Sequence, residues 1–127
     1  MQLRLQQMAQ ESEYHYVGMV GMGELAEVFC RYPFAEEVLE KAVFHRESMQ
    51  NGMNPFTVTI RLEPEAKKQE EGDSLQVEFE ACELRDGKSK TAAICQLGPE
   101  VLEGNLAKVH IFLVSKEKMD RLEANQR

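Results

Sequence analysis

One short region of the sequence combines a histidine, several glycines and two carboxylates around the start of a predicted helix. His15 and Gly18 come first, and Gly23, Glu24 and Glu27 follow. The first N–H groups of a helix have no partner within the helix, so they can polarise a carbonyl oxygen. A partly desolvated glutamate has a raised pKa and can act as a general base. The region could therefore carry acid–base chemistry on a carbonyl compound.

The same residues also have a purely structural explanation. Glu24 and Glu27 suit the first turns of a helix because the helix dipole favours negative charge there. His15 lies between two tyrosines in a stretch that alternates loosely like a strand, where a half-exposed histidine is ordinary. His45 and His110 have no partner at a metal-binding spacing. The sequence therefore predicts no metal and no cofactor.

The elements that must position this region begin with a long amphipathic stretch. Between Met22 and Met49, apolar residues recur at steps of three and four, which is the helical pattern. Tyr32-Pro33 interrupts it, because proline lacks an N–H and restricts the residue before it. We expect two helices, Met22–Arg31 and Pro33–Met49, with the first wrapped by a sheet and the second emerging at the edge of that sheet.

Strands are predicted mainly after this stretch. Apolar residues alternate in Phe56–Leu62, and again in Leu75–Leu84 with a bulge near Cys82-Glu83. Asp86-Gly87 is a hairpin signal that leads into a strand at Thr91–Leu97. The final strand, Ala107–Ser115, has apolar residues on both faces and is expected at the centre of the sheet.

Three segments give weaker patterns. Met1–Ser12 suits either a short strand or a helix. Pro64–Asp73 is charged and lacks apolar residues that could anchor it, so we expect a solvated, mobile connection. Ser115 can cap a short C-terminal helix at Lys116–Asn125.

Length and composition restrict the class of protein. The 127 residues fit a single domain, 1–127, and a formal net charge of −7 argues against binding to nucleic acid. Three cysteines without C-x-x-C spacing favour a reducing compartment, and the cytoplasm is expected. Because no run of about eighteen apolar residues is present, we expect no membrane association.

The order of motifs in the second half of the chain resembles the hotdog superfamily of acyl-thioester hydrolases and dehydratases. In that family a strand ending near a proline leads to a Gly-Asp pair, a further strand, a turn such as Asp-Gly-Lys and two more strands. Here Pro64, Gly72-Asp73 and Asp86-Gly87-Lys88 follow that order. The resemblance covers roughly Gly18–Val114. It implies an α+β fold in which about five strands of a curved antiparallel sheet wrap a central helix, with a short helix at the C-terminus.

The resemblance also implies a function and a site. The function would be hydrolysis of an acyl-CoA or acyl-carrier-protein thioester by a homodimer or a dimer of dimers. Gly18 and Gly23 would bind the substrate near the helix N-terminus, Glu24 or Glu27 would be the general base, and His15 would orient the water or the carbonyl. An alternative is a hydroxyacyl-thioester dehydratase with His15 as the base.

A third alternative belongs to another class of function. The chain would then be a non-catalytic hotdog or unrelated α+β module that binds a protein through an acidic helix face. This face consists of Glu36, Glu37, Glu40 and Glu47.

Overall fold

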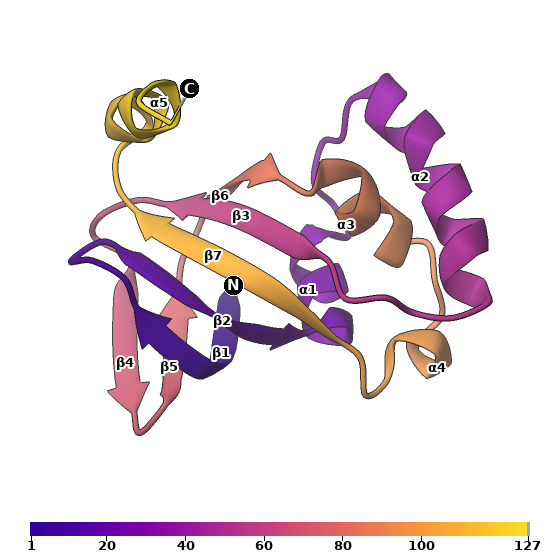
Figure 1. Cartoon of the computed structure of the whole chain (residues 1–127), viewed down its shortest axis with the longest axis horizontal. Helices are drawn as coiled ribbons and strands as arrows, with labels where there is room; N and C mark the ends of the chain where they lie inside the picture. The colour runs from indigo at the N-terminus through magenta and orange to yellow at the C-terminus, as the bar shows by residue number, and fades with distance from the viewer. Residues whose placement is uncertain (127) are drawn as a thin grey trace.

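The computed structural model describes residues 1–126, which form seven strands in one mixed sheet together with five helices (Figure 1). The strand order is β4-β5-β1-β2-β7-β3-β6. The strands are β1 Gln2–Gln10, β2 His15–Gly21, β3 Thr57–Leu62, β4 Lys67–Glu71, β5 Ser74–Glu78, β6 Cys82–Asp86 and β7 Leu106–Leu113. The helices are α1 Met22–Phe29, α2 Glu36–Gln50, α3 Lys88–Ile94, α4 Pro99–Leu102 and α5 Lys116–Ala124.

Strand β7 is central to the main part of the sheet, as its composition predicts. It pairs antiparallel with β2 and parallel with β3. Its inward residues Ala107, Val109 and Ile111 are fully buried, whereas Lys108 is exposed and His110 and Phe112 are only half-buried. This alternation defines an inner face, which carries the core, and an outer face.

The helices α1 to α4 lie to one side and one end of the sheet, whereas α5 lies at the far end of β7 (Figure 1). Helix α1 contributes Met22, Leu25 and Phe29 to the core. The first half of β1 adds Leu3 and Leu5, which are also fully buried.

Close packing joins the two halves of the sheet. The register of β1 against β2 shifts between Gln6 and Ala9, and Gln7 has a positive φ of 52°. Leu5 then packs so closely on Gly18 of β2 that a Cβ at Gly18 would lie 2.8 Å from the Cβ of Leu5. The absence of a side chain at Gly18 therefore lets the sheet fold onto itself.

The predicted hotdog-like fold is wrong. It required about five antiparallel strands around a long central helix, but the sheet has seven strands and contains the parallel pair β3–β7. Helix α1 has only eight residues, and the longer helix α2, with fifteen, buries only Ala42 and Met49. A helix with so little buried surface lies at the margin of the core.

Two strand predictions also fail. Leu75–Leu84 is not one bulged strand: β5 pairs with β1 and β6 pairs with β3, towards opposite ends of the sheet. Thr91–Leu97 does not follow a hairpin but belongs largely to α3. Gly87 takes a left-handed conformation with φ of 81° and caps this helix, whose Ala92 and Ala93 are small enough to pack against neighbouring elements.

The charged segment Pro64–Asp73, predicted to be a mobile connection, contains strand β4. A turn at Gly72, with φ of 61°, pairs β4 with β5 as a hairpin. All five residues of β4 are exposed and none is apolar, so the sequence has no alternating pattern that would predict this strand. Backbone pairing holds β4 in place, supplemented by a hydrogen bond of 2.6 Å that Lys68 donates to the Tyr16 hydroxyl.

Aromatic packing sets the position of α2. The ring of Tyr32 lies 5.2 Å from that of Phe29 and 5.1 Å from that of Phe34, measured between centroids. Its hydroxyl accepts a hydrogen bond of 3.0 Å from the backbone N–H of Leu84 in β6. The link between α1 and α2 is thereby tied to the edge of the sheet.

Ion pairs fix the C-terminal helix, whose predicted cap is confirmed. Ser115 accepts a hydrogen bond of 3.2 Å from the Lys118 N–H. Arg85 of β6 binds Glu83 on its own strand and both Asp120 and Glu123 of α5. These bonds, led by the one from Glu123, raise the pKa of Arg85 against the opposing effect of burial.

Both edges of the sheet are protected against pairing with another strand. Edge strand β4 is exposed and charged, and the Leu84 N–H of edge strand β6 already bonds Tyr32. Within residues 1–126, no helix is both long and apolar enough to cross a membrane.

Two glycines with positive φ, Gly72 and Gly87, allow a matched test of how closely the start of α3 packs against β3. A Cβ at Gly87 would lie 2.6 Å from the Thr57 carbonyl oxygen, whereas a Cβ at Gly72 would have no atom within 4 Å. Gly72→Ala should cost about 1 kcal/mol through left-handed strain alone, and Gly87→Ala about 1–3 kcal/mol more through overpacking. Urea unfolding of both variants measures this difference, and equal losses would contradict the close approach of Gly87 to β3.

Candidate functional site

The predicted catalytic residues do not converge. His15 begins β2, while Glu24 lies in the first turn of α1, directly after the other end of that strand. The seven residues of β2 span roughly 20 Å at the usual rise of an extended chain. His15 and Glu24 therefore cannot act on one reacting group in this conformation.

The two glutamates have different surroundings. Glu24 is half-buried and its Oε1 accepts a hydrogen bond of 2.8 Å from the Arg4 N–H, which ties α1 to β1. Burial raises its pKa, and the bond from Arg4 opposes that shift. Glu27 is exposed. Of the two, Glu24 alone has the desolvated setting that a general base requires.

The two predicted substrate-binding glycines also differ. Gly18 lies beneath Leu5, so packing within the sheet occupies the space beside it. Gly23 is exposed on α1, and no atom lies within 4 Å of the place a Cβ would take. A substrate could approach Gly23 but not Gly18.

The structure reveals a pairing of histidines that the sequence does not indicate. Nε2 of His15 and Nδ1 of His110 share a hydrogen bond of 2.9 Å. In the register of β2 and β7, His15 lies opposite Phe112 and Val17 lies opposite His110, so the two histidines are diagonal neighbours on the outer face. His15 also stacks on Phe112 at 4.0 Å between centroids. The pairing depends on long-range strand register, which residue spacing does not show.

Tyr16 points to the inner face, away from this pair. It is fully buried, and its hydroxyl receives the hydrogen bond from Lys68 of β4. The side chains therefore switch faces between His15 and Tyr16, which confirms that His15 belongs to the outer surface.

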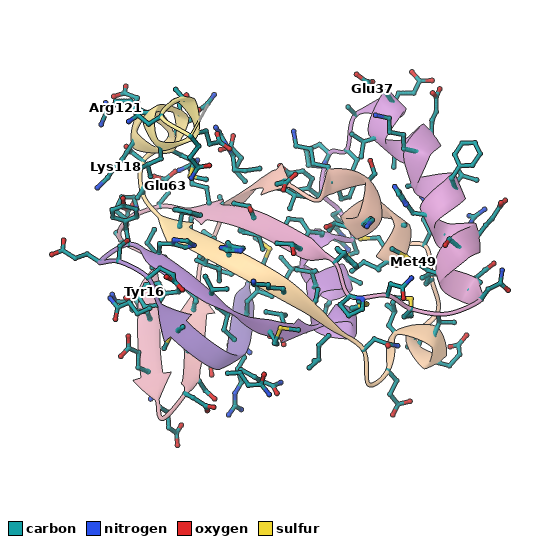
Figure 2. The ribbon with its side chains drawn as sticks, viewed as in Figure 1. Tyr16, Glu37, Met49, Glu63, Lys118 and Arg121 are labelled. Carbon is teal, nitrogen blue, oxygen red and sulfur yellow. The ribbon has the colours of Figure 1, made fainter. Side chains whose placement is uncertain are left out.

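A second candidate site is the exposed side of α2, for which we use the name acidic–apolar face. Glu37 and Met49 mark opposite ends of the helix in Figure 2. Exposed fractions are 41% for Leu39, 38% for Val43 and 75% for Phe44. At about 3.6 residues per turn, Glu36, Glu40 and Glu47 form a row along the helix. Leu39 and Val43 lie on one side of this row, and Phe44 lies on the other side. The face consists of Glu36, Glu37, Leu39, Glu40, Val43, Phe44 and Glu47.

A hollow adjoins this face. It has a volume of about 320 Å³ and lies where the link between α1 and α2 meets α3. Leu39 belongs both to the hollow and to the face. The other lining residues are mainly apolar: Cys30, Tyr32, Pro33, Phe34, Ala92, Cys95 and Gln96.

Two larger hollows have more charged linings. One of about 720 Å³ includes Arg85, Asp86, Lys88 and Lys90, and one of about 680 Å³ includes Glu63, Glu65, Glu78 and Glu80. None of these three hollows is lined by His15, Gly23 or Glu24. The predicted acyl-thioester site thus has no hollow among them.

Comparison with known proteins gives no match: no family model, curated protein or solved structure matches the chain.

The histidine pair should make stability depend on pH. Burial lowers the pKa of both imidazoles, assisted at His15 by the charge of His110 and at His110 by that of Lys108, while Glu11 opposes both shifts. The unfolded chain then takes up protons at higher pH than the folded chain. Stability is fully present above the ordinary histidine pKa of about 6.5 and falls as the pH drops through the lowered values.

We predict that His15→Gln and His110→Gln lose less unfolding free energy than the wild type between about pH 7.5 and about pH 5.5. Urea unfolding at both pH values is the measurement. His45→Gln, on α2, is the control and should follow the wild type. Wild-type pH dependence in both variants of the pair would show that these imidazoles do not titrate with folding.

Proposed function

We propose that the chain is a non-catalytic α+β protein-binding module whose acidic–apolar face on α2 docks a partner segment. The observation that carries the proposal is the exposure of Leu39, Val43 and Phe44 around a row of glutamates. Helix α2 buries only Ala42 and Met49 against the rest of the protein. The exposed apolar side chains lie on both sides of the glutamate row, so a docked partner would meet apolar and charged side chains together.

Rigid support of α2 favours this function. The Phe29–Tyr32–Phe34 aromatic packing holds one end, and Arg46 donates a hydrogen bond of 3.1 Å to Gln96 beyond α3. A face held in place before binding loses less conformational freedom when a partner docks. The hollow beside Leu39 offers a pocket for an apolar side chain of that partner.

Charge defines the partner's chemistry. Four glutamates lie on α2, against Lys41 and Arg46, and the chain as a whole carries a formal charge of −7. A partner with lysine or arginine beside a large apolar residue would match both the charge and the apolar surface, and the attraction would speed the encounter. We therefore infer a basic segment with an apolar anchor.

The enzymatic functions stay predictions. Glu24 with its raised pKa and the open Gly23 are the features that would serve thioester hydrolysis. Hydration of an enoyl thioester would need an acid near His15, and the side chain bonded to it is His110. A homodimer likewise stays a prediction. Free thiols at Cys30, Cys82 and Cys95 favour a reducing compartment, and we propose the cytoplasm.

The proposal predicts the residues on which binding depends. Peptides selected from a random display library against the wild-type chain should combine lysine or arginine with a large apolar residue. Leu39→Ser and Phe44→Ser should each weaken binding of a selected peptide by about tenfold or more, which is the scale of an interface hot spot. Glu40→Lys should slow association, and more so at low salt. Surface plasmon resonance gives the rates and affinities.

Glu117→Lys is the matched control for Glu40→Lys, because it reverses an exposed glutamate near the start of a different helix, α5. It should leave peptide binding unchanged. Selected peptides that bind the Leu39 and Phe44 variants as well as the wild type would overturn the docking face. Release of thiol from an acyl-thioester by the wild type, abolished in Glu24→Gln, would establish the enzyme instead.

A further inference from the structure

The histidine pair on the outer face places two side chains that can bind a metal ion next to each other. His15 and His110 come from adjacent strands, β2 and β7, and their facing nitrogens are 2.9 Å apart. Because the two strands are paired along their whole shared length, the backbone positions of both histidines are fixed relative to each other. Stacking of His15 on Phe112 at 4.0 Å further limits the motion of that ring.

The two nitrogens are available to a ligand from solvent. Each ring is only half-buried on a sheet face that α1 to α4 do not cover. Burial lowers the pKa of both rings, which favours the neutral imidazole that a metal ion requires as a ligand. For both facing nitrogens to bind a metal ion, the ring that donates the hydrogen bond must change tautomer, so that its proton is carried on its other nitrogen and both rings stay neutral.

We propose that His15 and His110 bind a divalent transition-metal ion of the nickel or copper class, with water in its remaining positions. For metal–nitrogen bonds of about 2.1 Å, nitrogens 2.9 Å apart subtend about 90° at the metal. This angle is that of neighbouring positions in square-planar and octahedral coordination, which nickel and copper adopt. Tetrahedral zinc would require the two nitrogens to move apart.

One charged residue near the pair favours binding of a cation, and another opposes it. Glu11 lies close enough that its carboxylate acts on both imidazoles, and its N–H donates a bond of 2.8 Å to the His15 carbonyl oxygen. The positive charge of Lys108 has the opposite effect on His110, because it lowers the pKa of that imidazole. Within residues 1–126, no group of three or more metal-ligand side chains occurs, so the proposed site has two protein ligands.

The site predicts selective loss of nickel binding. The experiment titrates Ni²⁺ calorimetrically into the full chain without a polyhistidine tag, in a Cys30→Ser background that removes the exposed thiol. Loss of an outer-shell partner alone costs about 10- to 100-fold in metal affinity. His15→Gln and His110→Gln, which remove a ligand, should therefore each weaken Ni²⁺ binding by at least about tenfold.

The third histidine of the chain is the matched control. His45→Gln should bind Ni²⁺ with wild-type affinity, and circular dichroism checks that each variant is folded. The proposal is overturned if the wild type takes up no Ni²⁺, if His45→Gln loses as much affinity as the pair variants, or if both pair variants bind like the wild type. Zn²⁺ binding tighter than Ni²⁺ binding would contradict the inferred coordination angle.

Discussion

Pairing of β7 on both its edges organises the whole molecule. With β2 on one side and β3 on the other, β7 aligns Ala107, Val109 and Ile111 on one face and His110 and Phe112 on the opposite one. The inner face then receives α1 and the folded-over first half of β1, and these fill the core.

Most of the core is formed by elements other than α2, and this explains how a helix can carry a docking face. Helix α1 supplies three large apolar side chains to the core, and α3 supplies Ala92, Ala93 and Ile94. Helix α2 buries Ala42 and Met49, and Val38 is half-buried against the core. Its remaining large apolar residues, Leu39, Val43 and Phe44, are exposed. Exposed apolar side chains contribute nothing to stability by burial, and binding to a partner is a physical use for them.

Local patterns predicted part of the fold correctly. The break at Tyr32-Pro33, the strand Phe56–Leu62, the central strand and the Ser115 cap all involve periodicity or backbone chemistry that a few neighbouring residues determine. The predictions that failed concern elements whose structure depends on contacts between residues far apart in the sequence. Strand β4 has no apolar residue, and its pairing comes entirely from β5. The Asp86-Gly87 pair predicted a hairpin, but Gly87 adopts a left-handed conformation at the N-cap of α3.

Among the candidate sites, too, features that depend on local spacing were predicted and features that depend on long-range contacts were not. The glutamates of α2 were predicted as an acidic helix face, because helical spacing is a local property. Exposure of Leu39, Val43 and Phe44 was not foreseen, since an amphipathic pattern does not show how much of the apolar side is buried. The His15–His110 bond depends on the register of β2 and β7, which are far apart in the sequence. The grouping of His15 with Glu24 failed because β2 extends between them.

Amide hydrogen exchange with and without a bound, selected peptide tests the central claim most directly. If the partner docks on α2, the peptide should slow exchange in residues 36–50 and in the link at residues 30–35, and leave exchange in β2 and β7 unchanged. Protection confined to the outer face of β2 and β7, with exchange in α2 unaltered, would contradict it.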